Sequence, residues 1–455
     1  MNNFDVLIIG GGPGGYQAAA RTGANGLKAA LFEQRSLGGV CLNEGCIPSK
    51  TLLNAAKICG HARHGELYGV KTGGARIDHP SVIARKNQVV ADLVAGVGSQ
   101  MKKHGVTVVN AAAAITGKAA QGFEVTANGE VFTGKHLIIA SGSGVSLPPI
   151  PGLKEGLGSG FVLTSREILD IPAPPEKLVV IGAGVIGLEM AAYFREAGSA
   201  VTVIEALDKI AGPMDAQISA LLQKELEKKG IVFHLGATVA EISANAVSYQ
   251  QGEQTLTAQA DKVLVCTGRG PATDGLGLEN IGVYTSGGAI VTDAHLRTNL
   301  PGVYAVGDVN GKYMLAHTAY REAEVAVNHI LGKRDYMRYD AVPSVIYTCP
   351  EAAGVGLTEE GALQRGLDIE VVRVPMLYSG RYLAETAGEE GLCKLVVDKK
   401  SRKLLGVHLL CPYASEIIYG AALMLEMRLD ADEIRELIFP HPTVGEVIRE
   451  GLFMI

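Results

Sequence analysis

Two copies of one glycine-rich pattern constrain the fold of this chain more than any other feature. Each copy lies between a strand-like apolar run and a helical run and has the spacing Gly-x-Gly-x-x-Gly: Gly10, Gly12 and Gly15 in the first copy, and Gly182, Gly184 and Gly187 in the second. In this context glycine lets the backbone approach a pyrophosphate at a helix N-terminus. The sequence therefore predicts two dinucleotide-binding domains rather than glycine-rich turns without a ligand.

An acidic residue closes each copy at the same distance from its glycines. Glu33 stands 18 positions after Gly15, and Glu205 stands 18 positions after Gly187, so the repeat is not a coincidence. A carboxylate at this place accepts hydrogen bonds from ribose hydroxyls and repels a 2′-phosphate. Residues 206–208 contain no arginine that would bind such a phosphate. The second site is therefore expected to prefer NAD to NADP.

Two cysteines, Cys41 and Cys46, enter a helix-period apolar run after the first copy. Helical positions five apart point about 140° away from each other, so the two sulfurs meet only if the first turn is irregular. Asn43 and Gly45 tolerate left-handed backbone, and Pro48 needs no hydrogen-bond donor at a helix start. A disulfide here would close a very short loop and would therefore contribute little to the stability of the fold. This favours a redox-active pair over a structural disulfide.

Two other interpretations of the cysteines remain open from the residues alone. They are a pair of reduced thiols at an ordinary helix start, or half of a zinc site. Zinc is disfavoured because the other five cysteines of the chain stand singly.

Two further segments carry polar residues with possible roles. Asp308 ends a buried-strand run, although an aspartate there is more commonly a turn or cap residue. His441 lies between two prolines, and Glu446 is near enough in sequence to orient its ring, as a general base requires. A histidine alone in such a place is more commonly an ordinary surface residue.

Composition excludes several classes of protein. The chain has 455 residues, enough for about three domains, and 47% hydrophobic residues with 58 glycines, which fits an α/β protein. A net charge of −6 gives no electrostatic case for nucleic acid or a membrane surface. No apolar run reaches the roughly 18 residues of a membrane span. The first strand begins by Asp5, which leaves no room for a signal or transit peptide, and isolated cysteines suit a reducing cytoplasm.

Taken together, these motifs resemble the pyridine nucleotide–disulfide oxidoreductases over essentially the whole chain. The order of the motifs matches: the first fingerprint, Gly39-x-Cys41-x4-Cys46-Ile47-Pro48-Ser49-Lys50, the second fingerprint, Tyr304-Ala305-x-Gly307-Asp308 and His441-Pro442-Thr443. Within that family the chain looks most like the dihydrolipoamide dehydrogenases. The resemblance implies an α/β fold with two Rossmann-like domains and a C-terminal α+β dimerisation domain. The implied parts are an FAD domain at 1–148, an NAD domain at 149–270, a central segment at 271–340 and an interface domain at 341–455.

The resemblance also implies a role for each matching residue. Cys41 would exchange with substrate, Cys46 would face the flavin, and His441 with Glu446 would be an acid–base dyad supplied by the other subunit. The implied FAD-site residues are Gly10, Gly12, Gly15, Glu33, Asp308, Lys50 beside the flavin N5, and Glu189 as its ion-pair partner. The implied NAD-site residues are Gly182, Gly184, Gly187 and Glu205, and Ala316 and Gly268 complete the cofactor-binding set.

The implied activity is oxidation of protein-bound dihydrolipoamide to lipoamide with reduction of NAD, through the cysteine pair and FAD. The implied partners are a second copy of the chain and, as a separate chain, a lipoyl-bearing protein of a 2-oxo acid dehydrogenase, acetoin or glycine cleavage system. No metal, nucleic acid or membrane is expected.

Two alternatives are an NAD(P)H-dependent reductase of another disulfide and a structural subunit kept for binding alone. The presence of Cys41, Cys46 and His441 argues against a structural subunit, which has no need of reactive thiols. Four departures from the common pattern bear on the substrate mouth and the redox potential: Val40, Glu44, Cys349 and Phe439.

Overall fold

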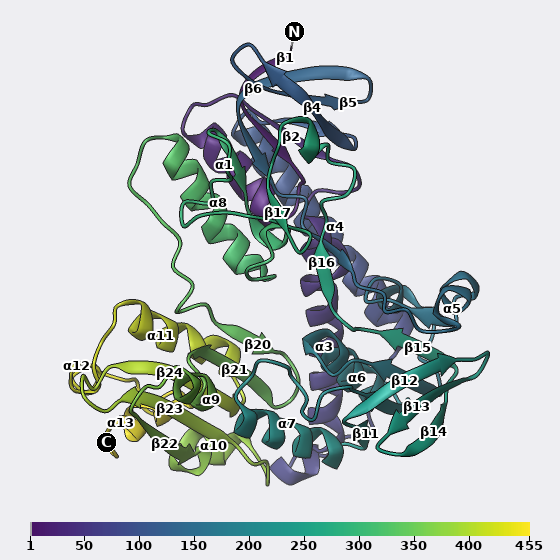
Figure 1. Cartoon of the computed structure of the whole chain (residues 1–455). Helices are drawn as coiled ribbons and strands as arrows, with labels where there is room; N and C mark the ends of the chain where they lie inside the picture. The colour runs from purple at the N-terminus through teal and green to yellow at the C-terminus, as the bar shows by residue number, and fades with distance from the viewer. Residues whose placement is uncertain (1) are drawn as a thin grey trace. The chain divides into compact units, whose positions relative to one another are not determined.

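The computed structural model describes residues 2–455, which form two compact units (Figure 1). The first unit comprises residues up to Pro48, residues 83–146 and residues 268–338. The second unit comprises residues 49–82, 147–267 and 339–455. The predicted division into four parts is not tested by this grouping and stays a prediction.

A seven-stranded sheet forms the centre of the first unit, in the order β3-β2-β1-β6-β5-β4 with β19 also beside β6. Its strands are β1 (Asn2–Ile9), β2 (Ala29–Glu33), β3 (Thr107–Asn110), β4 (Ala113–Ala119), β5 (Gly122–Ala127), β6 (Glu130–Ile139) and β19 (Val303–Ala305). The strands β3, β2, β1, β6 and β19 run parallel, and β4 and β5 are antiparallel. The Asn-Gly pair at residues 128 and 129 favours a two-residue hairpin turn, and it forms one between β5 and β6, where both residues have positive φ (51° and 76°).

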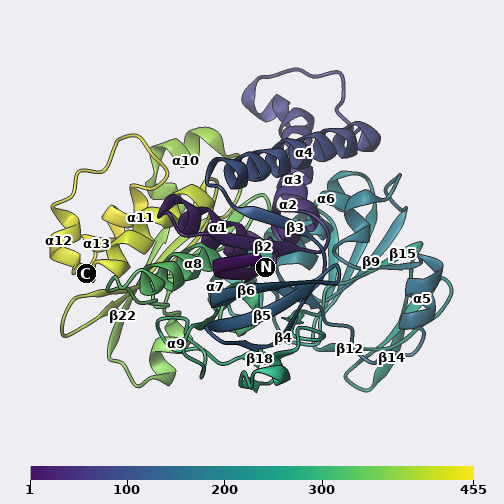
Figure 2. The same ribbon diagram turned by 90° about the horizontal axis from the view of Figure 1, so that it is seen from above.

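Two helices lie side by side against this sheet (Figures 1 and 2). They are α1 (Pro13–Ala24) and α8 (Ala316–Ile330). The hydroxyls of Tyr16 and Tyr320 share a hydrogen bond between them, and their rings meet edge-on with centroids 5.9 Å apart. The remaining elements of this part are α2 (Gly39–Glu44), most of α4 (His79–Lys103), β7 (Ser143–Val145), β16 (Arg269–Pro271), β17 (Thr285–Ser286) and β18 (Ala289–Ile290). The helix α3 (Cys46–Arg63) begins in the first unit and belongs to the second unit from Ser49 onward.

A five-stranded parallel sheet lies in the second unit, in the order β11-β10-β9-β15-β8. Its strands are β8 (Val162–Leu163), β9 (Lys177–Ile181), β10 (Ala200–Ile204), β11 (Ile231–His234) and β15 (Lys262–Val265). The helices of this part are α5 (Leu153–Ser159), α6 (Val185–Glu196) and α7 (Ala216–Lys228), and an antiparallel sheet consists of β12 (Ala237–Ile242), β13 (Ala246–Gln251) and β14 (Gln254–Gln259). Both predicted dinucleotide folds are therefore present, one in each unit.

The C-terminal residues form a five-stranded antiparallel sheet in the order β20-β21-β24-β23-β22, packed around an apolar core. Its strands are β20 (Ser344–Ile346), β21 (Glu351–Gly356), β22 (Ile369–Pro375), β23 (Leu392–Asp398) and β24 (Leu404–Cys411). The helices are α9 (Glu359–Gln364), α10 (Gly380–Glu385), α11 (Ala414–Glu426), α12 (Ala431–Arg435) and α13 (Val447–Leu452). The amphipathic pattern over 430–438 favours a helix, which in the structure is shorter and ends at Arg435.

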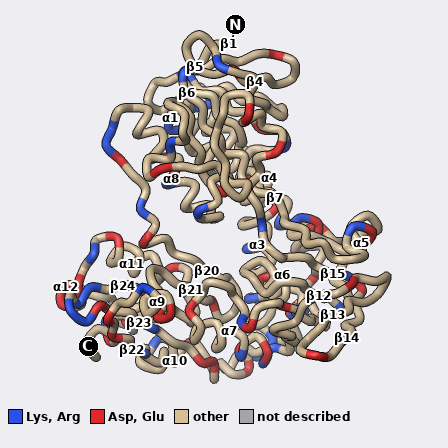
Figure 3. Tube along the Cα trace, viewed as in Figure 1, with Lys and Arg blue, Asp and Glu red and all other residues tan. Residues whose placement is uncertain are grey.

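Charged residues of both signs are interspersed along the backbone of both units (Figure 3). Within residues 2–455, no helix is long and apolar enough to cross a membrane.

Candidate active site and dinucleotide sites

The first glycine loop follows β1 and has no room for side chains at two of its glycines. Gly10 has φ +102°, and a Cβ there would lie 2.2 Å from the carbonyl oxygen of Ala140. A Cβ on Gly15 would lie 1.7 Å from the carbonyl oxygen of Gly10. The N-terminus of α1, at Gly12, has no side-chain cap in the described structure. The loop therefore presents uncapped N–H groups at a helix N-terminus, which fits a pyrophosphate.

The second glycine loop, in the other unit, repeats this construction after β9. Gly182 has φ +103°, and its Cβ would lie 2.5 Å from the carbonyl oxygen of Cys266. A Cβ on Gly187 would lie 2.1 Å from the carbonyl oxygen of Gly182. The close approaches are thus the same in both copies, and the residues present fit a second dinucleotide.

The two acidic residues make matching hydrogen bonds. Oε2 of Glu33 accepts from the Gly11 amide (2.7 Å) and Oε1 from the Arg35 amide (2.8 Å). Oε2 of Glu205 accepts from the Ala183 amide (2.6 Å) and Oε1 from the Leu207 amide (2.9 Å). Each carboxylate oxygen has a second lone pair, so each acid retains capacity to accept from a ribose hydroxyl.

A backbone tether also recurs in each glycine loop. The Gly38 amide donates to the carbonyl oxygen of Gly11 (2.8 Å), and the Ala211 amide donates to that of Ala183 (2.8 Å). The segment that follows the tether lies closer to the loop in the first copy than in the second. A Cβ on Gly39 would lie only 2.6 Å from the Cα of Gly12, whereas a Cβ on its counterpart Gly212 would meet no described atom within 4 Å. The segment that carries the cysteines is therefore pressed onto the first glycine loop.

The structure breaks the helix between the two cysteines, as the spacing predicted. Cys41 lies on α2, Cys46 is the first residue of α3, and Gly45 between them has φ −148° and ψ −106°. Left-handed backbone was expected to be possible at Asn43 and Gly45, but it occurs at Gly38 and Gly39 instead. Nδ2 of Asn43 donates to the carbonyl oxygens of Leu37 and Gly39, which stabilises the turn without left-handed backbone at residue 43.

Asp308 belongs to a hydrogen-bonded group in the first unit. The Ser143 hydroxyl donates to Oδ2 of Asp308, and Nε of Arg269 donates to that hydroxyl (2.8 Å). Burial lowers the pKa of the Arg269 guanidinium, and the nearby Asp308 charge opposes this change. Gly268, immediately before Arg269, has φ +121°. The group fixes the direction of the Asp308 carboxylate, and no sequence motif indicated that Ser143 or Arg269 belongs to it.

A buried carboxylate supports the turn before Asp308. Oε2 of Glu322 accepts from the Gly307 amide (2.6 Å) and from Nδ2 of Asn310 (2.9 Å), and its side chain is fully buried. Glu322 lies on α8, which begins at Ala316. Sequence reasoning missed Glu322, although a glutamate on the Ala/Val face of a helix is a recognisable pattern.

The expected ion pair between Lys50 and Glu189 is present in the second unit. Nζ of Lys50 lies 2.9 and 3.0 Å from the two carboxylate oxygens of Glu189, whose side chain is 3% exposed. The Tyr347 amide donates to Oε1 of Glu189 (3.0 Å), and the Lys50 ammonium lies 4.4 Å from the centre of the Tyr347 ring. No local pattern indicated Tyr347, because its contact with Glu189 joins residues 158 positions apart. The role of Lys50 toward the flavin stays a prediction.

His441 and Glu446 form the expected pair, also in the second unit. Nδ1 of His441 lies 2.8 Å from Oε2 of Glu446. The histidine side chain is 78% exposed and the glutamate is 12% exposed. With Nδ1 bound to the carboxylate, Nε2 is the ring nitrogen that points away from Glu446 and can exchange a proton. Both residues line a surface hollow of about 420 Å³ together with Phe439.

The other departures from the common pattern have structural partners. The carbonyl oxygen of Cys349 accepts from the ammonium group of Lys229. Glu44 pairs with Arg35 at 2.6 Å.

Comparison with known proteins agrees with this geometry. A family model described as pyridine nucleotide-disulphide oxidoreductase matches residues 4–323, and one described as the dimerisation domain of such enzymes matches residues 342–452. The chain is 40% identical to dihydrolipoyl dehydrogenase 2, mitochondrial, of Arabidopsis thaliana over 98% of this chain and 89% of that protein. It is 37% identical to dihydrolipoyl dehydrogenase of Cupriavidus necator over 99% of this chain and 98% of that protein. It superposes on a solved structure, the Cu(II) complex of the HOCl-induced flavoprotein disulfide reductase RclA from Escherichia coli, with a TM-score of 0.87 and 28% identity over 99% of this chain and 100% of that one.

The chain therefore belongs to the pyridine nucleotide-disulphide oxidoreductase family. It is a flavoprotein disulfide oxidoreductase with FAD and NAD as cofactors, and the predicted fold class is confirmed. Its dimerisation domain supports a homodimer.

Proposed function

We propose that this protein oxidises dihydrolipoamide to lipoamide and reduces NAD. The observation that carries the proposal is the contact between the cysteine segment and the first glycine loop, made by the Gly38–Gly11 hydrogen bond and the close approach of Gly39 to Gly12. It brings a dithiol–disulfide pair next to a dinucleotide loop within one unit. The curated relatives named dihydrolipoyl dehydrogenase support the choice of substrate.

Different residues would hold the two dinucleotides. The first glycine loop, Glu33 and Asp308 would hold FAD, and the second glycine loop with Glu205 would hold NAD. When bound, FAD accepts an electron pair from the reduced cysteines and delivers it as hydride to NAD. The chain's own residues handle the thiols and the protons.

The cysteines would carry out thiol–disulfide exchange. One substrate thiol gives its proton to Nε2 of His441, and the thiolate attacks Sγ of Cys41, which breaks the Cys41–Cys46 disulfide of the oxidised enzyme. The second substrate thiol then attacks the substrate sulfur of the mixed disulfide, which breaks the bond to Cys41 and releases the cyclic disulfide, and its proton passes to the departing Cys41 sulfur. The substrate loses two electrons, both cysteines are reduced, and Glu446 stabilises the histidine while it holds the proton.

We also propose that His441 acts on the cysteines of the partner subunit. Its exposed ring lies in the dimerisation domain, where a second copy can reach it. The lipoyl group would come from a separate protein of a 2-oxo acid dehydrogenase, acetoin or glycine cleavage system. A cytoplasmic location is part of the proposal because the isolated cysteines suit a reducing compartment.

An anaerobic spectroscopic titration tests the activity. The purified protein is expected to be yellow, to change its visible spectrum on addition of dihydrolipoamide, and to form NADH when NAD is then added. A colourless protein without flavin would contradict the proposal. Faster turnover of glutathione disulfide than of dihydrolipoamide would instead favour a reductase of another substrate.

Mixing two inactive variants tests the shared site. A Cys41→Ser/His441→Ala mixed dimer has one site with both residues intact and one with neither. Random mixing makes such dimers about half of the total, so about one quarter of wild-type activity returns if sites act independently. Mass spectrometry of differently tagged subunits must first show exchange. No recovery after proven exchange would place Cys41 and His441 of one site in the same subunit.

A further inference from the structure

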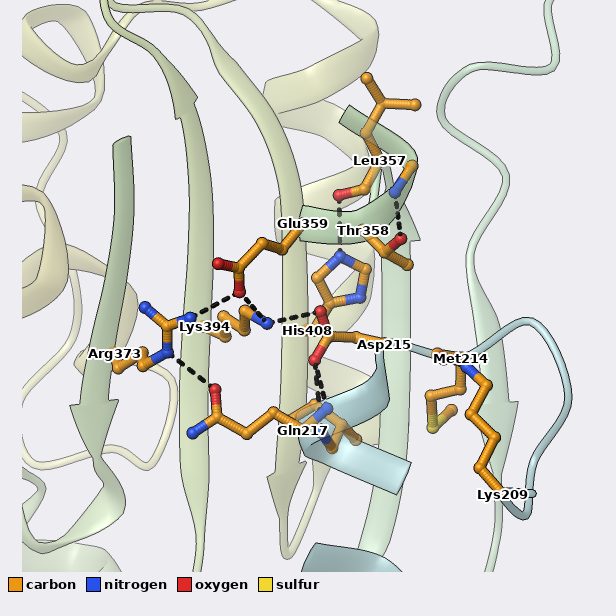
Figure 4. Close-up of polar contacts among 12 residues, drawn as sticks. Lys209, Met214, Asp215, Gln217, Leu357, Thr358, Glu359, Arg373, Lys394 and His408 are labelled. Carbon is orange, nitrogen blue, oxygen red and sulfur yellow. Dashed lines mark hydrogen bonds and ion pairs between the residues drawn. The ribbon is translucent and has the colours of Figure 1, made fainter. Parts of the chain in front are cut away.

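A buried group of charged side chains connects the C-terminal sheet to the second dinucleotide fold (Figure 4). Nζ of Lys394, on β23, lies 2.7 Å from Oδ2 of Asp215 and 2.7 Å from Oε2 of Glu359. The Lys394 and Asp215 side chains are 1% and 0% exposed. Arg373 contacts Glu359 as well and donates to Gln217 through its Nε (2.8 Å). Lys394 and Asp215 are thus shielded from water, whereas Glu359 and Arg373 stay 26% and 42% exposed, and burying the Lys394–Asp215 pair costs desolvation free energy.

Asp215 has a second role at the start of α7. Its Oδ1 accepts from the amides of Gln217 (3.0 Å) and Ile218 (3.3 Å), so it caps the helix while its other oxygen binds Lys394. The position of this cap is therefore tied to β23 by Lys394.

A short series of backbone bonds continues from Asp215 to the second glycine loop. The amide of Met214, the preceding residue, donates to the carbonyl oxygen of Ala211 (3.2 Å), and the Ala211 amide donates to that of Ala183 (2.8 Å). The Ala183 amide in turn donates to Oε2 of Glu205 (2.6 Å). Ala183 is thus held from two sides, by Glu205 and by the segment that ends at Asp215.

Lys209, within the same segment, adds a further restraint. Nζ of Lys209 donates to the carbonyl oxygen of Met214 (2.7 Å), which closes the segment on itself. The hydroxyl of Ser219 on α7 donates to the carbonyl oxygen of Ile210. Residues 207–214 therefore move with the start of α7 rather than independently of it.

From these contacts we propose that Lys394 is a positioning residue for NAD: by fixing Asp215, it holds residues 207–215 against the second glycine loop in the arrangement that binds the dinucleotide. The inference rests on the proposed assignment of NAD to this loop. Lys394 itself touches neither the glycine loop nor Glu205 in the contacts described, so its influence passes through the backbone of residues 211–215.

Binding of ADP-ribose, the non-reacting part of NAD, tests the proposal by calorimetry on the FAD-loaded dimer. Lys394→Met removes both ion pairs and keeps the side-chain volume. Its Kd for ADP-ribose is expected to rise about tenfold, within the usual range for coupling between separate sites. The rate of flavin reduction by dihydrolipoamide should stay within about twofold of wild type, because neither ion pair of Lys394 involves the cysteines or the His441–Glu446 pair.

Lys399 offers a matched control immediately after β23. It also pairs with an aspartate, Asp368, at 2.8 Å, but both side chains are largely exposed. Lys399→Met should change neither ADP-ribose binding nor flavin reduction. If Lys394→Met binds ADP-ribose as wild type does, Lys394 is only structural and the proposal is wrong, whatever happens to Tm.

A double variant covers the case in which Lys394→Met does not fold. Asp215→Asn combined with Lys394→Met leaves no unpaired buried charge and keeps a side-chain oxygen that caps α7. It should fold and still bind ADP-ribose weakly, since Asn at 215 has no bond to β23. Wild-type affinity in this variant would overturn the proposal. Separately, Glu205→Ala should weaken ADP-ribose binding, and an unchanged Kd there would refute the assignment of the NAD site instead.

Discussion

The two glycine loops of this protein are nearly identical in backbone and differ in the segment that lies over them. Gly10 and Gly182 have φ values of +102° and +103°, and Glu33 and Glu205 accept from equivalent amides. In the first copy a Cβ on Gly39 would meet the Cα of Gly12 at 2.6 Å. In the second copy the counterpart of Gly39 is Gly212, and a Cβ there would meet no described atom within 4 Å apart from its chain neighbours, so residues 207–215 cover this loop less closely.

This difference matches the two tasks. A cofactor that stays bound benefits from a covered loop, and one that leaves after each turnover needs an open loop. The covering segments also differ in chemistry. Four residues after the tether amide of Gly38 stands the apolar Leu42, and four residues after that of Ala211 stands the buried, charged Asp215. One backbone design thus supports a redox pair in one copy and an ion-paired anchor in the other.

Removing a cysteine should have the largest effect, because it abolishes the chemistry beside the first glycine loop and leaves nucleotide binding at both loops intact. Cys46→Ser is expected to lower dithiol turnover by at least about 10³-fold, since the enzyme loses a reacting sulfur. Flavin content and the Kd for ADP-ribose should remain at wild-type values, because the glycine loops are intact. Steady-state kinetics, absorbance and calorimetry provide the three measurements. Loss of flavin would mean that Cys46 is also needed to hold the cofactor.

Equivalent glycines in the covering segments should respond differently to alanine. Gly39 (φ +56°) and Gly212 (φ +50°) both have left-handed backbone, which costs a substituted residue about 1–2 kcal/mol. Gly39→Ala adds a clash with the Gly12 backbone, whereas a Cβ on Gly212 meets no described atom within 4 Å. Gly39→Ala should lose most of its flavin, and Gly212→Ala should keep it. Equal flavin content in both purified variants would show that the close packing of Gly39 on Gly12 is not needed to hold the flavin.

Glu33 and Glu205 should affect the binding of different nucleotides. Wild-type enzyme is expected to prefer NAD to NADP by at least about tenfold, because an unpaired 2′-phosphate facing Glu205 costs more than roughly 1.4 kcal/mol. Glu205→Ala should narrow this preference, and Glu33→Ala should leave it unchanged while weakening FAD binding. The ratio of kcat/KM for the two nucleotides is the readout. A preference that survives Glu205→Ala would mean that this carboxylate does not face the ribose.

A buried histidine of the C-terminal sheet should give a smaller, pH-dependent effect. Burial lowers the pKa of His408, and the nearby Lys394 adds to the decrease. The unfolded chain then binds a proton near pH 6.5 that the folded chain does not bind, so this contribution to stability is present above that pH and lost as pH falls below it. The loss is at most about 1.4 kcal/mol per pH unit. Urea unfolding of wild type and His408→Gln at about pH 7.5 and about pH 5.5 should show a smaller difference in the variant. The same difference in both proteins would assign it to other groups.

The sequence was sufficient where a local pattern determines a local structure. Both fingerprints, the equal acid spacing and the break between Cys41 and Cys46 follow from the sizes and backbone preferences of neighbouring residues. The Asn128-Gly129 hairpin and the sheet-forming runs follow for the same reason.

Sequence reasoning failed where contacts join residues far apart in the chain. Lys394 and Asp215 stand 179 positions apart and Tyr347 and Glu189 stand 158 apart, and neither pair leaves a periodic pattern. The left-handed residues were misplaced because several glycines near Cys41 had the same freedom. The packing of Gly39 on Gly12, which only tertiary structure creates, determined which of them used it.

The two tethers are single amides, and this makes each loop observable by hydrogen exchange. The Gly38 amide is protected only while the cysteine segment lies on the first loop, and the Ala211 amide only while residues 207–215 lie on the second. Deuterium uptake at Gly38 measures how often the cysteine segment leaves the first glycine loop. Uptake at Ala211 measures how often residues 207–215 leave the second glycine loop. One isotope-labelled sample therefore reports the opening of both dinucleotide loops separately, without a probe attached to either.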